Sequence, residues 1–68
     1  MIVDLNGRAT PLPEGSTLAD AVAAAGAGGD DRGVAVAVDG EVVPRPQWDG
    51  RALAEGEDVE VVRAVQGG

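Results

Sequence analysis

Two dipeptides constrain the fold of this 68-residue chain more than any other feature of its sequence. Asn6-Gly7 and Asp39-Gly40 each stand between two short runs rich in apolar residues. Asparagine, aspartate and glycine tolerate the positive φ angles of a type I′ turn, which is the shortest connection between two antiparallel strands. The sequence therefore predicts two β-hairpins, one at the N-terminus and one in the second half of the chain.

The first hairpin is predicted to pair residues 1–6 with residues 8–12. Apolar and polar residues alternate in part along "MIVDLN", which is typical of a strand with one buried face. Pro11 and Pro13 follow in the second strand, and proline has no backbone N–H to donate to a sheet. We therefore expect this second strand to be short and to lie at an edge of the sheet.

A single helix is predicted between the hairpins, in the stretch "EGSTLADAVAAAGAGG". Ser16 or Thr17 can cap its first turn, and Thr17 with Asp20 forms a variant of the capping box. An apolar stripe at helical spacing should face the core; it comprises Leu18, Ala21, Val22 and Ala25. Gly26 suits the position just after the helix, and the glycine-rich residues 25–33 are expected to form a flexible connection.

The second hairpin should begin with an interior strand. "VAVAV" at residues 34–38 has small apolar residues on both faces, as expected of a central strand whose second face is either covered or lightly exposed. The strand after the Asp39-Gly40 turn should end at Pro44 and Pro46, because neither proline can donate a backbone hydrogen bond.

The last strand is predicted over residues 58–65. Before it, the sequence has turn residues and one short helical turn, for which Trp48 and Leu53 are the apolar anchors. The alternation of apolar and polar residues within the strand shifts phase at Val62, and such a shift is typical of a β-bulge.

An α+β fold follows from this order of elements. If the last strand lies beside the first, the two are parallel and the last strand is central. This is the ubiquitin-like β-grasp arrangement, a mixed sheet of four or five strands packed on one helix. We expect residues 1–65 to form a single β-grasp domain and residues 66–68 to form a flexible C-terminal tail ending in Gly-Gly.

The composition argues against several classes of function. The chain has no cysteine and no histidine, so it offers no thiol nucleophile, imidazole base or ordinary zinc site. We predict no metal site, no bound cofactor and no enzyme activity of its own. Twelve acidic residues against five arginines give a net charge of −7, which disfavours nucleic acid and anionic membranes as partners. Neither a signal peptide nor a membrane span is visible, so we expect a cytoplasmic protein that is monomeric when free.

Two motifs make the chain resemble a known family. One is P-R-x-x-W at residues 44–48, and the other is L-x-x-G-x-x-V-x-V-V-x-A-V-x-G-G at residues 53–68. Together with the opening Asn-Gly hairpin and the short capped helix, they resemble the ThiS family, the sulfur carriers of thiamine biosynthesis, over nearly the whole chain. The chain departs from the family at Asp39, where asparagine is frequent, and in the alanine- and glycine-rich loop 25–33.

The resemblance implies that the protein carries sulfur on its C-terminus. An adenylating enzyme similar to ThiF would use ATP to activate the carboxylate of Gly68. A sulfur donor such as a cysteine desulfurase would then convert it to a thiocarboxylate, which a thiazole synthase similar to ThiG would consume. Gln66 and Gly67 would thread into the partner's active site, where a Cβ at position 67 or 68 would crowd the nucleotide and the attacking sulfur.

Alternative interpretations stay open at this point. The terminal glycines could be a frayed chain end. Arg63, Arg45 and Trp48 are candidate partner contacts, but a solvated strand face, an ion pair and a core side chain are the respective alternatives. The valines and alanines on the open face of the sheet are a candidate docking surface. The carrier could also serve molybdopterin, cysteine or a specialised metabolite, or the domain could be a β-grasp interaction module without covalent chemistry.

Overall fold

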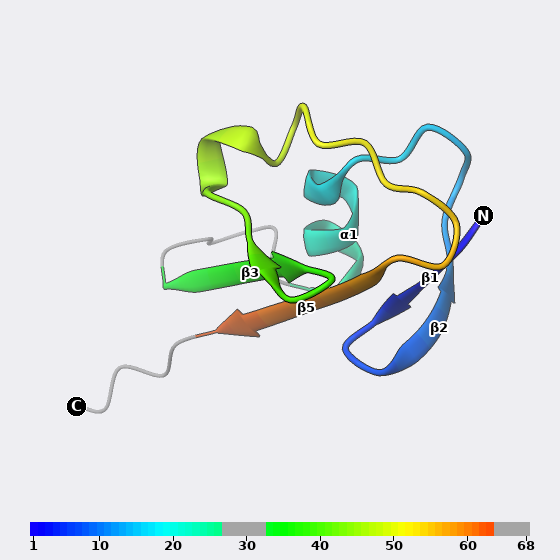
Figure 1. Cartoon of the computed structure of the whole chain (residues 1–68), viewed down its shortest axis with the longest axis horizontal. Helices are drawn as coiled ribbons and strands as arrows, with labels where there is room; N and C mark the ends of the chain where they lie inside the picture. Colours follow the sequence, from blue (N-terminus) through cyan, green and yellow to red (C-terminus); the bar gives the residue numbers. More distant parts are fainter. Residues whose placement is uncertain (27–32, 64–68) are drawn as a thin grey trace.

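The computed structural model describes residues 1–26 and 33–63 (Figure 1). Within them, one helix packs on a five-stranded mixed sheet with the strand order β2-β1-β5-β3-β4. The elements are β1 (Ile2–Leu5), β2 (Arg8–Pro11), α1 (Leu18–Ala24), β3 (Val34–Val38), β4 (Glu41–Val42), the short 3₁₀ helix η1 (Arg45–Gln47) and β5 (Asp58–Arg63). This is the predicted β-grasp arrangement.

Both predicted hairpins are present, and their turn residues adopt the conformation that the sequence requires. The φ angles of Asn6 and Asp39 are 54° and 50°, and those of Gly7 and Gly40 are 82° and 84°. Positive φ at both central residues is the type I′ geometry, which matches the twist of the flanking strands. The second strands of the two hairpins, β2 and β4, form the two edges of the sheet, so the prediction that β2 is an edge strand is confirmed.

The last strand, β5, lies in the middle of the sheet. It runs parallel to β1, with Asp4 opposite Asp58 and Leu5 opposite Val59. On its other side it runs antiparallel to β3. The two strands nearest the ends of the chain are therefore neighbours in the centre of the sheet, as the β-grasp prediction requires.

The predicted bulge at Val62 is wrong. The register between β5 and β3 is continuous from Val59 to Arg63. Val62 faces away from the helix and is 56% exposed. Its apolar side chain therefore lies on the face of the sheet that the helix does not cover, and the register of the strand does not change there. The predicted final residues of this strand, 64–65, lie outside the described residues.

The helix α1 begins with the predicted capping box, and Thr17 is its cap. The Thr17 hydroxyl oxygen accepts a hydrogen bond from the backbone N–H of Asp20 at 3.4 Å, and the Asp20 carboxylate accepts one from the Thr17 N–H at 2.8 Å. Ser16, the other candidate, is buried and donates its hydroxyl hydrogen to the carbonyl oxygen of Pro13 at 2.7 Å. Ser16 therefore closes the preceding turn, and Thr17 satisfies the first turn of the helix.

The helix ends earlier than its apolar stripe predicts. The first three residues of that stripe are buried, but Ala25 is exposed because the helix stops at Ala24 and Ala25 is its C-cap. Gly26 follows with a φ of 83°, the left-handed conformation that commonly terminates helices. Most of the predicted flexible connection, residues 27–32, lies outside the described residues.

The core lies between the sheet and α1, and the long segment between β4 and β5 closes it from the side (Figure 1). Its buried hydrophobic residues are Val3, Leu5, Leu18, Ala21, Val22, Val36, Val38, Val43, Trp48, Leu53 and Val59. The predicted anchors of the closing segment, Trp48 and Leu53, are both buried, and η1 is the predicted short helical turn. The indole N–H of Trp48 donates to the carbonyl oxygen of Val43 at 2.9 Å, so the buried ring has its polar group satisfied.

Replacing Thr17 by alanine should lower the free energy of unfolding by about 1 kcal/mol, because the N–H of Asp20 loses its acceptor. Thr17→Ser keeps the hydroxyl group and is the matched control, for which we expect little change. Urea denaturation followed by far-UV circular dichroism measures both variants. Equal losses in the two variants would contradict the capping role.

Candidate functional site

The candidate site is the end of β5, from which the chain continues to the predicted reactive terminus. Gln66, Gly67 and Gly68 themselves lie outside the described residues. Up to Arg63, β5 is held in the ladder with β3, where Arg63 lies opposite Val34. The chain that precedes the predicted tail is therefore anchored in the middle of the sheet and not at an edge.

Asn6 extends the support of β5 beyond the last residue of β1. Its backbone N–H donates to the carbonyl oxygen of Val59 at 2.9 Å, and its side-chain carbonyl oxygen accepts from the N–H of Val61 at 2.7 Å. The sequence analysis assigned Asn6 a turn role only. No local signal could reveal the second role, since Val61 is 55 positions away in the chain.

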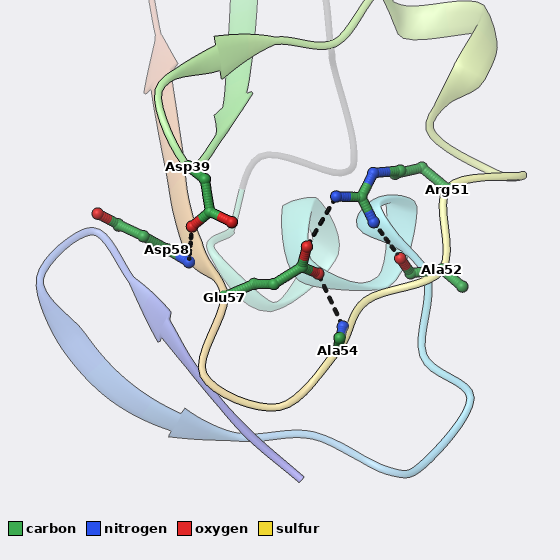
Figure 2. Close-up of polar contacts among 6 residues, drawn as sticks. All are labelled: Asp39, Arg51, Ala52, Ala54, Glu57 and Asp58. Atoms are coloured by element: carbon green, nitrogen blue, oxygen red, sulfur yellow. Dashed lines mark hydrogen bonds and ion pairs between the residues drawn. The ribbon is translucent and has the colours of Figure 1, made fainter.

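A network around Arg51 fixes the loop that leads into β5 (Figure 2). The guanidinium group donates to the Glu57 carboxylate at 2.7 Å and also to the carbonyl oxygen of Ala52. The same carboxylate accepts from the backbone N–H of Ala54 at 2.7 Å. The hydrogen bond to Glu57 raises the pKa of Arg51 above its ordinary value because it favours the charged guanidinium. These contacts hold the approach to the central strand in one conformation.

The first residue of β5 is tied to the β3–β4 turn through Asp39. The Asp39 carboxylate accepts a hydrogen bond from the backbone N–H of Asp58 at 3.0 Å (Figure 2). The Asp39 N–H also donates to the Asp58 carbonyl oxygen at 2.7 Å. An asparagine at this position would present the same kind of acceptor oxygen. Aspartate in place of the asparagine that is frequent in the family this sequence resembles therefore leaves this contact intact.

The three candidate partner contacts differ in their surroundings. Trp48 is 6% exposed and lies in the core, which agrees with its interpretation as a core side chain. Arg45 lies in η1 just before it and is exposed, and the backbone N–H of Trp48 donates to the Arg45 carbonyl oxygen at 3.0 Å. Arg63 is exposed at the end of β5. Of the three, Arg63 is the residue nearest in sequence to the predicted tail.

The face of the sheet that α1 leaves uncovered carries an apolar strip, which we define as Ala35, Ala37, Val42 and Val62. Cross-strand pairing places Val62 opposite Ala35 and Ala37 opposite Val42, so the strip crosses β5, β3 and β4. Val42 is 70% exposed. These are the small apolar residues that the sequence analysis took as a candidate docking surface, and they lie beside the second half of β5.

Comparison with known proteins gives the family. The model of the ThiS family matches residues 3–68. The chain belongs to the ThiS family. Membership of the ThiS family supports a sulfur carrier role in thiamine biosynthesis.

Two solved structures share the fold of this ThiS-family chain. One is the crystal structure of a thiamine biosynthesis protein (ThiS) from Geobacter metallireducens, with a TM-score of 0.79, 24% sequence identity and coverage of 100% of both chains. The other is the solution NMR structure of a thiamine biosynthesis protein from Geobacter metallireducens, with a TM-score of 0.80 and 24% identity, covering 100% of this chain and 88% of that one. A comparison with curated protein sequences gave no match.

Two further observations concern the described part of this ThiS-family chain. None of its helices there has the length and apolar character needed to cross a membrane. Among the same residues, no group of three or more acidic side chains is arranged so that it could hold a metal ion.

Proposed function

We propose that this protein carries sulfur for thiazole formation in thiamine biosynthesis, as a thiocarboxylate on Gly68. The observation that carries the proposal is the match of the ThiS family over residues 3–68, which includes the Gly-Gly sequence. The anchoring of β5 in the centre of the sheet supports it, because a carrier must present its terminus from a body that stays folded during the reaction.

The chemistry requires activation of a poor electrophile. A carboxylate has no good leaving group, so a ThiF-like adenylating enzyme would transfer AMP from ATP to Gly68 and release pyrophosphate. A sulfur donor such as a cysteine desulfurase would supply the sulfur as a persulfide, whose terminal sulfur displaces AMP and forms an acyl disulfide with the carrier. A second thiol, of the adenylating enzyme or in solution, would then attack the donor's sulfur in that disulfide, which releases the thiocarboxylate and leaves a disulfide between the two thiols. A ThiG-like thiazole synthase would then take the sulfur. The carrier contributes the reacting carbon and no catalytic group, and we place this reaction in the cytoplasm, where ATP is available.

The residues near the terminus have distinct proposed roles. Gly67 and Gly68 lack a Cβ and can enter a narrow active site in any backbone conformation, with Gln66 leading them in. Arg63 would dock the tail on an acidic surface of the partner. The apolar strip would bury its exposed valines and alanines against the adenylating enzyme.

Intact-mass spectrometry tests the proposal. The protein is incubated with ATP, the ThiF-like enzyme of the same organism and a sulfur source, and a parallel sample lacks ATP. We expect a mass gain equal to the exchange of one oxygen for one sulfur, located in the C-terminal peptide and dependent on ATP. An unchanged mass, with an enzyme preparation that is active on a known carrier, would refute the covalent mechanism.

A further inference from the structure

A row of acidic side chains lies on the open face of the sheet beside the apolar strip. Asp4 and Asp58 lie opposite each other on the parallel strands β1 and β5. Glu60 follows two residues after Asp58 and so points to the same face. Together with Asn6 and Gly7 these residues line an open depression. We call Asp4, Asp58 and Glu60 the acidic row.

The acidic row has no cationic partner among residues 1–26 and 33–63. One carboxylate oxygen of Asp4, Oδ1, is buried and accepts no hydrogen bond from the described residues. No cation of the described residues therefore compensates the charge of the acidic row.

The arginines of the described residues belong to the opposite side of the sheet. Arg8 lies opposite the buried Leu5 and so shares the face that bears α1. Arg63 comes four residues after the buried Val59 in β5, so its side chain points to the same face as Val59. The remaining two, at positions 45 and 51, lie in the segment that closes the core beside α1. Among the described residues, the arginines thus lie away from the acidic row, although other acidic residues such as Glu41 share their side of the sheet.

This arrangement costs the free protein stability. Like charges on adjacent strands repel each other, and a buried carboxylate oxygen without a donor loses its hydration without compensation. Cations supplied from outside would relieve both effects. Because no three of the described acidic residues are arranged to hold a metal ion, cationic side chains of another protein are the chemically suitable source.

We infer that the open face docks a protein surface on which exposed apolar side chains are flanked by arginine or lysine. The apolar side chains would cover the apolar strip, and the cations would pair with the acidic row. The inference rests on the proposed function and commits to the adenylating enzyme as the partner. That enzyme acts before the terminus bears any chemical mark, so it must recognise the body of the carrier.

The test compares two double variants that remove the same amount of charge. Asp58→Asn with Glu60→Gln neutralises two positions of the acidic row. Asp49→Asn with Glu41→Gln is the matched control, because Glu41 lies opposite the buried Val38 and Asp49 follows Trp48 in the segment that closes the core.

The rate of association with the immobilised ThiF-like enzyme is measured by surface plasmon resonance at low and at physiological salt. We expect the acidic-row variant to associate about 10-fold more slowly than the wild type at low salt and to lose most of the salt dependence. The control should stay within about twofold of the wild type. Equal rates for the two double variants would overturn the inference.

Thermal unfolding and the mass gain of the wild type complete the test. Removing like charges should raise the unfolding midpoint of the acidic-row variant by a few degrees, so that slower association cannot come from unfolding. A wild type that gains sulfur but binds independently of the acidic row refutes the docking inference alone. Charge-dependent binding without a gain of sulfur refutes the proposed function alone. A wild type that does not bind the enzyme refutes both.

Discussion

Deletion of Gly68 should abolish the gain of sulfur while leaving the fold intact. The deletion moves the terminal carboxylate back by one residue, or about 3.5 Å along an extended chain. Reacting atoms must lie within about 3–3.5 Å of each other, and a misplacement of 1 Å can cost about 100-fold in rate. We therefore expect adenylation to slow by at least about 100-fold, measured as ATP-dependent mass gain over time.

Two further measurements make this result specific. Gly68→Ala keeps the length of the tail but adds a Cβ, and it should lose less activity than the deletion if reach is the dominant requirement. The thermal midpoint of both variants should equal that of the wild type, because the buried core spans residues 3–59. A deletion variant that accepts sulfur as fast as the wild type would remove Gly68 from the mechanism. A module that acts without covalent chemistry would tolerate the deletion.

Trp48→Ala should be the most destabilising single substitution in the described part of the chain. Truncating a buried tryptophan costs about 3–5 kcal/mol, and it also leaves the buried carbonyl oxygen of Val43 without its donor at 2.9 Å. A domain of this length has a total stability of roughly 3–10 kcal/mol. We therefore expect the variant to be largely unfolded at physiological temperature, as measured by far-UV circular dichroism and urea denaturation.

Trp48→Phe is the control that separates packing from the hydrogen bond. It retains an aromatic ring but loses the indole N–H, so its cost should be about 1–3 kcal/mol and the variant should stay folded. If both substitutions lowered the free energy of unfolding equally, the ring itself would not be the element that holds the segment between β4 and β5 on the core.

The parts of the fold that were predictable from the sequence depend on short-range interactions. The Asn6-Gly7 turn and the capping box of Thr17 and Asp20 involve residues at most three positions apart, and their side chains determine the local backbone conformation directly. The β-grasp topology was also predictable, because the order of hairpin, helix and strands allows few arrangements.

The predictions failed where the outcome depends on which face is covered. Ala25 has the helical spacing of a core residue, but the helix ends before it, so it is exposed. Val62 looked like a shift of register because both faces of β5 carry valine, whereas the strand simply has one uncovered face. The acidic row was likewise invisible, since it forms only when Asp4 and Asp58, far apart in the sequence, become neighbours across two parallel strands.

The central position of β5 has a mechanical consequence. A force that pulls on the end of this strand acts along it, and the strand is hydrogen-bonded to a parallel neighbour on one side and an antiparallel neighbour on the other. Such a load shears both ladders at once, so many hydrogen bonds must break together and none can be peeled off first. On an edge strand the same pull would open the sheet one bond at a time. The fold of the domain therefore resists a pulling force that is applied at the C-terminal end of β5.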